Sequence, residues 1–215
     1  MIKVVLWDLD GTILDTTDLI LASYKHAFEK VFGRLIDDKE ALANFGRTLK
    51  DVMFTYSKEK GEELIEAYRD FNHKRHDGMI RPYPGILDAL ANVKRRGFGQ
   101  AVVTSKTEWL AKRGLELFGL QGHIDDIIGF ESTNLHKPNP DPILEALKRL
   151  KIEPEEAIFV GDSAADEGCA KAAGVPFVSA LWGPNPEFAA AADSWQKIVD
   201  PRDILHLIQK RGPRI

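Results

Sequence analysis

The sequence has almost no cysteine. Cys169 is the only one among 215 residues, so disulfide bonds within the chain and cysteine-rich zinc modules are excluded. Cys169 lies in an alanine-rich stretch, and we expect it to be buried by packing. The chain must therefore be held by an apolar core, and its 44% hydrophobic residues are sufficient to form one at this length.

An excess of positive charge and long apolar runs are also absent. Lys and Arg number 29 against 33 Asp and Glu, a formal net charge of −4, which does not fit a nucleic-acid-binding or polybasic membrane surface. No apolar run approaches the roughly 20 residues of a membrane helix, and the first residues show no signal-peptide pattern. We expect a cytoplasmic monomer or homodimer that binds neither nucleic acid nor membranes.

Short apolar runs without polar alternation recur along the chain and predict buried parallel strands. They cover residues 2–7, 99–103, 127–130, 157–160 and 175–180. Helical patterns separate the later runs, at residues 86–96, 107–118, 140–150 and 164–173. Strands that alternate with helices predict an α/β fold with a doubly wound, Rossmann-like parallel sheet.

Residues 16–80 interrupt this alternation. They contain helical stretches at 17–32, 39–44, 49–55 and 62–76 and no convincing strand. Leu19, Ala27 and Phe28 recur at helical spacing, which indicates a packing face. We therefore predict a core formed by residues 1–15 and 81–215 and an inserted helical domain at 16–80, with hinges at 15–18 and 79–84. The basic stretch 210–214 predicts a frayed tail.

Polar residues follow the carboxyl ends of the predicted strands, where doubly wound sheets bind ligands. Alone, each group has an ordinary interpretation as a turn, a loop or a helix cap. Their joint placement indicates one site. The groups are Asp8 with Asp10, Thr104 with Ser105, Lys137, and Asp162 with Asp166.

The chemistry of these groups is consistent. Crowded carboxylates need a cation or a shared proton, and four acids form an oxygen-rich pocket suited to Mg²⁺. Lys137 and the hydroxyl of Thr104 or Ser105 suit a phosphate beside that ion. A carboxylate can attack the phosphate and form an aspartyl-phosphate.

The segment Asp8-Leu9-Asp10-Gly11-Thr12 resembles the first motif of the haloacid-dehalogenase (HAD) superfamily. Thr104, Lys137-Pro138, and Gly161-Asp162 with Asp166 are similar to its second, third and fourth motifs. The helical insertion resembles the cap domain of many phosphatases in this superfamily.

This resemblance implies a role for each residue. Asp8 would be the nucleophile, and Asp10 the general acid and then the base. Mg²⁺ would be bound by the carboxylates of Asp8 and Asp162 and the backbone carbonyl of Asp10. Asp166 would act mainly by contacting the groups around these ligands rather than the ion itself. The Thr104 side chain and the Ser105 backbone N–H would bind the phosphate, and Lys137 would neutralise the nucleophile and the developing charge.

Several related activities fit less well. Dehalogenases lack an acid at the position of Asp10. Sugar phosphomutases commonly have a cap histidine where this chain has Ile20, and phosphonate-cleaving members use a cap lysine with which Lys50 is out of register. Receiver domains share the acids, Thr/Ser and Lys but are shorter and lack the insertion; a catalytically silent regulator would not require all these residues.

Two phosphatase branches stay open. The chain resembles phosphoglycolate phosphatases, which implies a small phosphorylated metabolite as substrate, and residues 67–77 resemble an inorganic pyrophosphatase branch. Arg47 lies in a segment similar to the cap specificity loop of both, and its guanidinium suits a carboxylate or a second phosphate. His73, His76 and Asp77 share a helical face, which we expect to be polar cap surface rather than a metal site.

Overall fold

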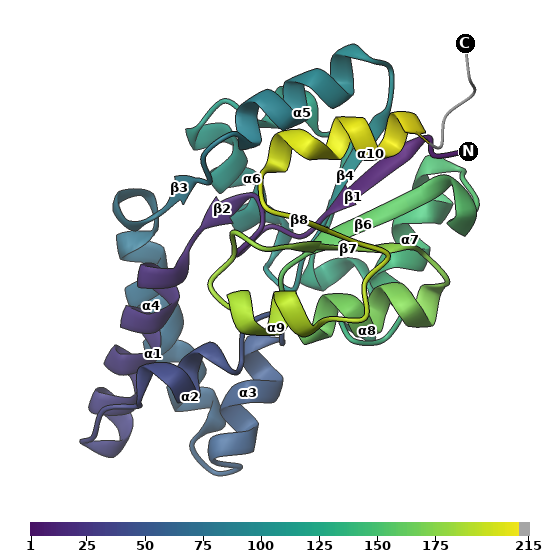
Figure 1. The fold of residues 1–215 in the computed structure, drawn as a ribbon. Coiled ribbons are helices and arrows are strands. Elements are labelled where there is room, and N and C mark those ends of the chain that lie inside the picture. Colours follow the sequence, from purple (N-terminus) through teal and green to yellow (C-terminus); the bar gives the residue numbers. More distant parts are fainter. Residues whose placement is uncertain (211–215) are drawn as a thin grey trace.

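The computed structural model describes residues 1–210, and its centre is a six-stranded sheet (Figure 1). The sheet order is β5-β4-β1-β6-β7-β8, and every neighbouring pair is parallel. This confirms the predicted doubly wound α/β fold. The strands are β1 (Val4–Trp7), β4 (Gly99–Val103), β5 (Asp126–Ile128), β6 (Ala157–Gly161), β7 (Phe177–Ala180) and β8 (Gln196–Ile198).

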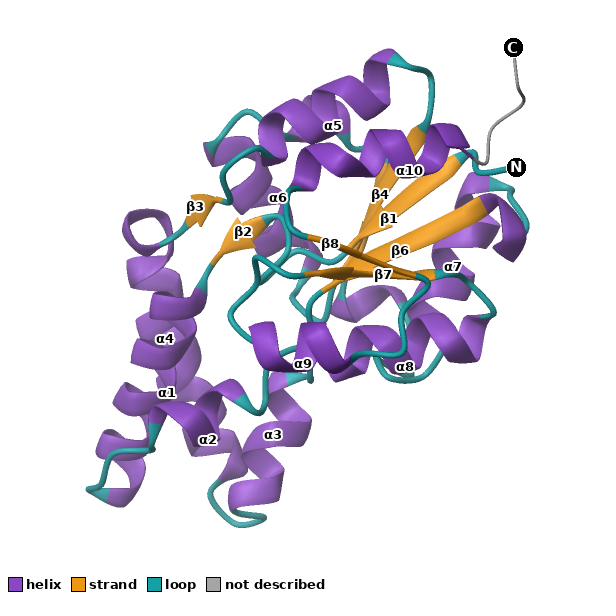
Figure 2. Cartoon of the chain, viewed as in Figure 1, coloured by secondary structure: helices purple, strands orange, loops and turns teal. Residues whose placement is uncertain are grey.

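Helices cover both faces of this sheet (Figure 2). Strand β1 supplies both cores, because Val5 and Trp7 join one apolar cluster while Val4 and Leu6 join the other. Helices α5 (Ile86–Arg95), α6 (Glu108–Leu117) and α10 (Ile204–Lys210) pack on the first face. Helices α7 (Asp141–Leu150), α8 (Ala164–Ala173) and α9 (Pro186–Ala191) pack on the second, where Cys169 is fully buried as predicted.

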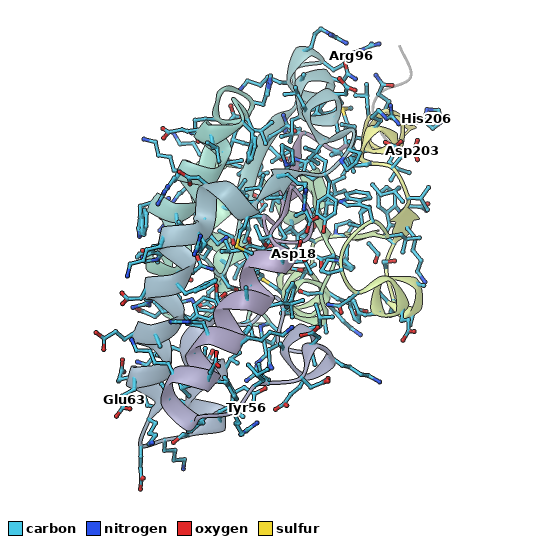
Figure 3. The ribbon with its side chains drawn as sticks, turned by 90° about the vertical axis from the view of Figure 1, so that its left-hand side faces the viewer. Asp18, Tyr56, Glu63, Arg96, Asp203 and His206 are labelled. Atoms are coloured by element: carbon cyan, nitrogen blue, oxygen red, sulfur yellow. The ribbon has the colours of Figure 1, made fainter. Side chains whose placement is uncertain are left out.

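Residues 17–79 form a separate helical block. It contains α1 (Thr17–Phe32), α2 (Asp38–Leu42), α3 (Leu49–Tyr56) and α4 (Gly61–Met79). The block has its own apolar cluster, centred on Phe28, Met53 and Leu64. Figure 3 places Tyr56 and Glu63 at the end of the block far from Arg96, the residue that follows α5, with Asp18 between. No helix in residues 1–210 is long and apolar enough to cross a membrane.

The predicted hinges contain a small sheet that the sequence did not indicate. Strands β2 (Leu14–Asp15) and β3 (Arg81–Pro82) pair antiparallel. Arg81 also forms ion pairs with Asp15 and Asp18, each at 3.7 Å. The two connections to the helical block are therefore bound to each other rather than independent.

Other differences concern short elements. The predicted strand 127–130 is shifted, because the structure forms β5 at 126–128 and a 3₁₀ helix at Phe130–Ser132. Strand β8 was missed because only Ile198 in it is buried, so it lacks an apolar run. The remaining 3₁₀ helices are Gln121–His123, Pro154–Glu156 and Pro201–Asp203. The predicted frayed tail at 210–214 lies, beyond Lys210, outside the described residues.

Candidate active site

The candidate site lies at the carboxyl ends of β1, β4 and β6. Asp8 directly follows β1, Thr104 follows β4, and Asp162 follows β6. The chain runs from β1 to β4 on one side and returns to β6 on the other, so these three ends border the point where the winding direction reverses. Such a reversal leaves a crevice in which doubly wound sheets bind ligands.

Three buried acids and one buried lysine form the floor of the site. Carboxylate oxygens of Asp8, Asp162 and Asp166 lie within 4.8 Å of one another. The Lys137 Nζ donates to Asp8 Oδ1 and Asp166 Oδ1, both at 2.6 Å, and to the Val103 carbonyl at 3.1 Å. The three contacts match the three N–H groups of an ammonium, so they fix this lysine between the two acids.

Burial and crowding control protonation on this floor. Burial, and then repulsion from Asp166, raises the pKa of Asp8 to about 7, against the attraction of Lys137. Burial alone would lower the pKa of Lys137, but Asp166 and Asp8 raise it overall, so this lysine stays charged. Burial, followed by repulsion from Asp8 and Asp166, also raises the pKa of Asp162. A further cation would favour the carboxylate forms.

Asp162 offers an oxygen to such a cation. Thr12 Oγ1 donates to Asp162 Oδ1 at 3.0 Å, whereas Asp162 Oδ2 is buried without a partner. Gly11, at φ +89°, brings the turn after β1 so close that a Cβ there would lie 2.4 Å from Asp162 Oδ2. An unsatisfied carboxylate oxygen beside Asp8 fits a hard divalent ion such as Mg²⁺.

Asp166 differs from the other two acids, because both of its oxygens have partners. Oδ1 accepts from Lys137, and Oδ2 accepts from the hydroxyl and backbone N–H of Ser163 at 2.5 and 3.1 Å. Ser163 is the N-cap of α8, so this contact is part of a capping box. The geometry fits an acid that orients Lys137 rather than one with a free oxygen for a metal.

A cavity of about 140 Å³ lies above this floor, between the sheet and the helical block. Six of the eight residues predicted for the site line it: Asp8, Asp10, Arg47, Thr104, Ser105 and Lys137. Asp162 and Asp166 lie next to Asp8 behind the cavity wall. The structure thus brings all the predicted residues to one place.

The cavity also contains cations that sequence reasoning did not assign. Lys106 Nζ forms an ion pair with Asp10 Oδ1 at 2.6 Å. Lys106 is two residues after Thr104, and that proximity was the available signal. Arg69 on α4 and Lys50 on α3 line the opposite wall. Arg69 lies in the stretch 67–77 that resembles the pyrophosphatase branch, but this resemblance does not single it out, because its position over the site depends on how the helical block packs.

The helical block contacts the core at the site through a backbone turn. Ser105 Oγ donates to the Gly46 carbonyl at 2.8 Å. Gly46 has φ +82°, and a Cβ there would lie 2.2 Å from Ser163 Oγ, so a larger residue would be strained and would collide with the core. Arg47 follows this turn; its side chain is exposed and donates to Asn44 Oδ1 at 3.1 Å.

A second contact joins α4 to α6. His76 is fully buried there, so its predicted position on the polar cap surface is wrong. Its Nδ1 is 2.8 Å from Asp77 Oδ1, and Asp77 accepts from Arg113 on α6 at 2.9 Å. His73 packs edge-on against Trp109, with ring centroids 4.9 Å apart. Leu14, His76 and Ile80 all approach Gly114 on α6, because each has a side-chain atom within 4 Å of the position that a Cβ on Gly114 would take.

Comparison with known proteins gives consistent results. A family model described as haloacid dehalogenase-like hydrolase matches residues 5–180. A protein of Caldanaerobacter subterraneus subsp. tengcongensis, provisionally named pyrophosphatase PpaX, is 44% identical over 185 residues, 86% of this chain and 84% of that one. Pyrophosphatase PpaX of Halalkalibacterium halodurans is 37% identical over 174 residues, 81% of each chain.

Solved structures agree on the fold. A Lactobacillus plantarum protein, provisionally named a phosphoglycolate phosphatase, has a TM-score of 0.87 and 25% sequence identity; the match covers 96% of this chain and all of that one.

Proposed function

Because the chain belongs to the haloacid dehalogenase-like hydrolase family and is a phosphatase of that family, we propose that it is a Mg²⁺-dependent phosphatase acting through an aspartyl-phosphate. We propose inorganic pyrophosphate as its substrate and phosphoglycolate as the second candidate. The observation that carries the chemistry is the Asp8–Lys137–Asp166 cluster beside the unsatisfied Asp162 oxygen.

Asp8 is the proposed nucleophile. One of its carboxylate oxygens forms a bond to phosphorus, while the bond from phosphorus to the leaving-group oxygen breaks and its electron pair stays on that oxygen. Asp10 donates a proton to this oxygen. In the second step water gives a proton to Asp10, its oxygen bonds to phosphorus, and the aspartyl-phosphate bond breaks to restore Asp8.

The remaining residues position the transferred group. The Thr104 hydroxyl and the Ser105 backbone N–H would bind its oxygens. Lys137 would neutralise the negative charge of Asp8 and the charge that develops on the transferred group. The carboxylates of Asp8 and Asp162 and the Asp10 carbonyl would hold Mg²⁺, which neutralises phosphate charge when bound. Asp166 is proposed to orient Lys137. Because removing one preorganised donor costs about 10²–10³-fold in kcat, each of these contacts is expected to matter.

The charge of the cavity supports a substrate with a second anionic group. Arg47, Lys50 and Arg69 line the wall that the helical block provides, facing the Asp8 floor. A substrate with a single phosphate and a neutral remainder would leave these cations without partners. The relatives named PpaX favour pyrophosphate. Phosphoglycolate, whose carboxylate is the alternative second anion, is supported by the Lactobacillus plantarum neighbour.

We further propose that residues 16–80 act as a cap that closes over bound substrate and excludes water. The Ser105–Gly46 contact supports this, because it joins the phosphate-binding loop to the cap. Ile20, which lines the cavity, stands where phosphomutases commonly carry a histidine, and this supports hydrolysis over return of the phosphate to substrate.

The test is phosphate release from pyrophosphate and from phosphoglycolate with Mg²⁺, compared by kcat/KM, with an Asp8→Asn variant as the control. A preference for pyrophosphate, absent in the variant, is the expected result. A preference for phosphoglycolate would select the second candidate. Absence of turnover on both, and on other small phosphate esters, would overturn the enzymatic proposal.

A further inference from the structure

We propose that Lys106 is a leaving-group residue: its ammonium binds the negative charge that departs with the leaving group, and it thereby selects substrates whose leaving group is itself an anion. The phosphate released from a diphosphate is such a group. This inference rests on the proposed function and deepens it, because it gives a reason for cleavage of pyrophosphate in preference to esters with a neutral remainder.

The position of Lys106 carries the inference. Lys106 Nζ donates to Asp10 Oδ1 at 2.6 Å, and both residues line the cavity. The side chains are 10% and 19% exposed, so the contact is largely shielded from water. Asp10 is the residue proposed to give its proton to the leaving-group oxygen. An ammonium bound to Asp10 therefore lies within reach of that oxygen and of the group attached to it.

The other lysine of the site is not available for this role. Lys137 is buried, and its three N–H groups are used by Asp8, Asp166 and the Val103 carbonyl. Lys137 is therefore bound to the proposed nucleophile, Asp8, rather than free to bind the leaving group. Within residues 1–210, Asp10 is the hydrogen-bond partner that the Lys106 ammonium has, so two of its N–H groups can bind an incoming oxygen.

The surroundings of Lys106 favour an anion. Asp8 and Asp10 are the acids among the described residues that line the cavity, and Arg69, His73 and Lys106 line it as well. Burial, followed by the charges of Arg69 and Arg113, lowers the pKa of His73, so its imidazole is neutral and can donate a hydrogen bond. The charges of Arg69 and Lys106 both act on His73, so an anionic leaving group beside His73 would lie close to both cations.

With pyrophosphate as the substrate, each bond that forms in the proposed step is matched by one that breaks. The Asp8 oxygen bonds to one phosphorus, the bond from that phosphorus to the bridging oxygen breaks, and the bridging oxygen keeps the electron pair. Asp10 enters this step as the acid, with its proton on Oδ2 while Oδ1 accepts from Lys106. It gives this proton to the bridging oxygen and becomes a carboxylate. Lys106, which contacts both the released phosphate and Asp10, neutralises the charge that the step creates. It transfers no proton itself.

This role predicts an effect that depends on the leaving group. A lysine that only holds Asp10 in place would affect phenyl phosphate at least as much as pyrophosphate, because phenoxide is the more basic leaving group and depends at least as strongly on the proton from Asp10. A lysine that binds the leaving group would affect pyrophosphate strongly and a substrate with an apolar leaving group weakly. The two roles are therefore distinguished by a ratio of rates rather than by one rate.

The experiment compares Lys106→Met with wild type on pyrophosphate and on phenyl phosphate at saturating Mg²⁺. We expect kcat/KM for pyrophosphate to fall about 10²–10³-fold and that for phenyl phosphate to fall less than about tenfold. Lys106→Arg keeps the charge and should retain most of the pyrophosphate activity. The matched control is Lys112→Met, which removes an exposed lysine from α6, the helix that follows Lys106. It should leave both rates unchanged.

Equal fractional losses on the two substrates, or an unchanged rate on pyrophosphate, would overturn the inference while leaving the proposed function intact. A wild-type protein that hydrolyses neither these two substrates nor phosphoglycolate and other small phosphate esters would overturn the proposed function, and the inference with it. Thermal unfolding of Lys106→Met is measured in parallel. If this variant unfolds, Lys106→Gln replaces it in the same comparison, with the same expected loss of selectivity.

Discussion

The two walls of the cavity are built differently. On the wall formed by the sheet, the charged groups are bound to one another. Lys137 is buried and joins Asp8 to Asp166, and the partly buried Lys106 is paired with Asp10. On the wall formed by the helical block, Arg47, Lys50 and Arg69 are exposed. Groups held by several short contacts suit a step that is the same for every substrate, whereas exposed cations can adjust to the rest of the substrate. We infer that the buried Lys137 cluster provides the reaction and that the helical block provides most of the selection. Lys106, whose ammonium has a single hydrogen-bond partner within the described residues, adds selection from the sheet side.

The largest effect should come from the nucleophile. Asp8→Asn keeps an oxygen that can accept from Lys137 but removes the attacking carboxylate, so we expect kcat/KM to fall by at least about 10⁴-fold. Acid-quenched wild type should carry covalent phosphate on Asp8, detected by mass spectrometry, and the variant should carry none. Asp203→Asn, a change at an exposed acid, is the control. Phosphate bound elsewhere would contradict the role of this wall.

The second effect concerns the stability of the same wall. Lys137→Met leaves Asp8 and Asp166 buried without their cation, and we expect the free energy of unfolding in the presence of a chelator to fall by about 3–5 kcal/mol. Urea denaturation measures it. Lys148→Met removes an exposed pair with Glu145, so a loss below about 1 kcal/mol is expected there. Equal losses in the two variants would mean that the buried cluster is not specially coupled.

Magnesium should stabilise the folded protein through Asp162. Mg²⁺ at a hundred times its dissociation constant should add about 2.7 kcal/mol to the free energy of unfolding. Asp162→Asn retains an oxygen for Thr12 but loses the charge that faces Asp8, so its thermal unfolding should respond little to Mg²⁺. Calorimetry with and without the ion checks this without any activity measurement. A full response in the variant would place the ion elsewhere.

The smallest effect is expected at His76, where α4 of the helical block packs against α6 of the core. Burial lowers the pKa of His76, and the charge of Lys106 lowers it further, against the hydrogen bond that Asp77 accepts from the imidazole, which raises it. The unfolded chain therefore binds the proton more readily, so stability is highest above the ordinary histidine pKa of about 6.5 and falls as the pH drops below it. His76→Leu should flatten this dependence between about pH 8 and pH 5.

Thermal unfolding across that range provides the measurement. Replacing the exposed His206 on α10 by Gln should leave the wild-type slope. An unchanged slope in His76→Leu would show that another group controls stability in acid.

The sheet wall could be predicted from the sequence because its information is local. Asp8 and Asp10 directly follow a buried strand, and Asp162 follows another, so their meeting is a consequence of parallel topology. The pairing of Lys106 with Asp10 required the structure, because the sequence does not show in which direction the side chain of a loop lysine points.

The wall formed by the helical block was less predictable, because residues on α4 reach the cavity only through the packing of this block against the core. Arg69 faces the site and His76 is buried against Gly114, although both lie in the same charged helix. Strands β2, β3 and β8 were missed for a related reason. They contain two or three residues each, too few for a pattern, and they are held by pairing rather than by apolar burial.

The most direct test of the division between the walls is a double variant, Arg47→Gln with Arg69→Gln, assayed for kcat/KM on pyrophosphate and on phenyl phosphate. This double variant removes charge-assisted hydrogen bonds between the helical block and the substrate. We expect kcat/KM for pyrophosphate to fall by at least about tenfold, mainly through KM, while kcat/KM for phenyl phosphate stays close to that of wild type. An equal loss on both substrates would contradict the account, because the helical block would then contribute to the reaction itself rather than to the choice of substrate.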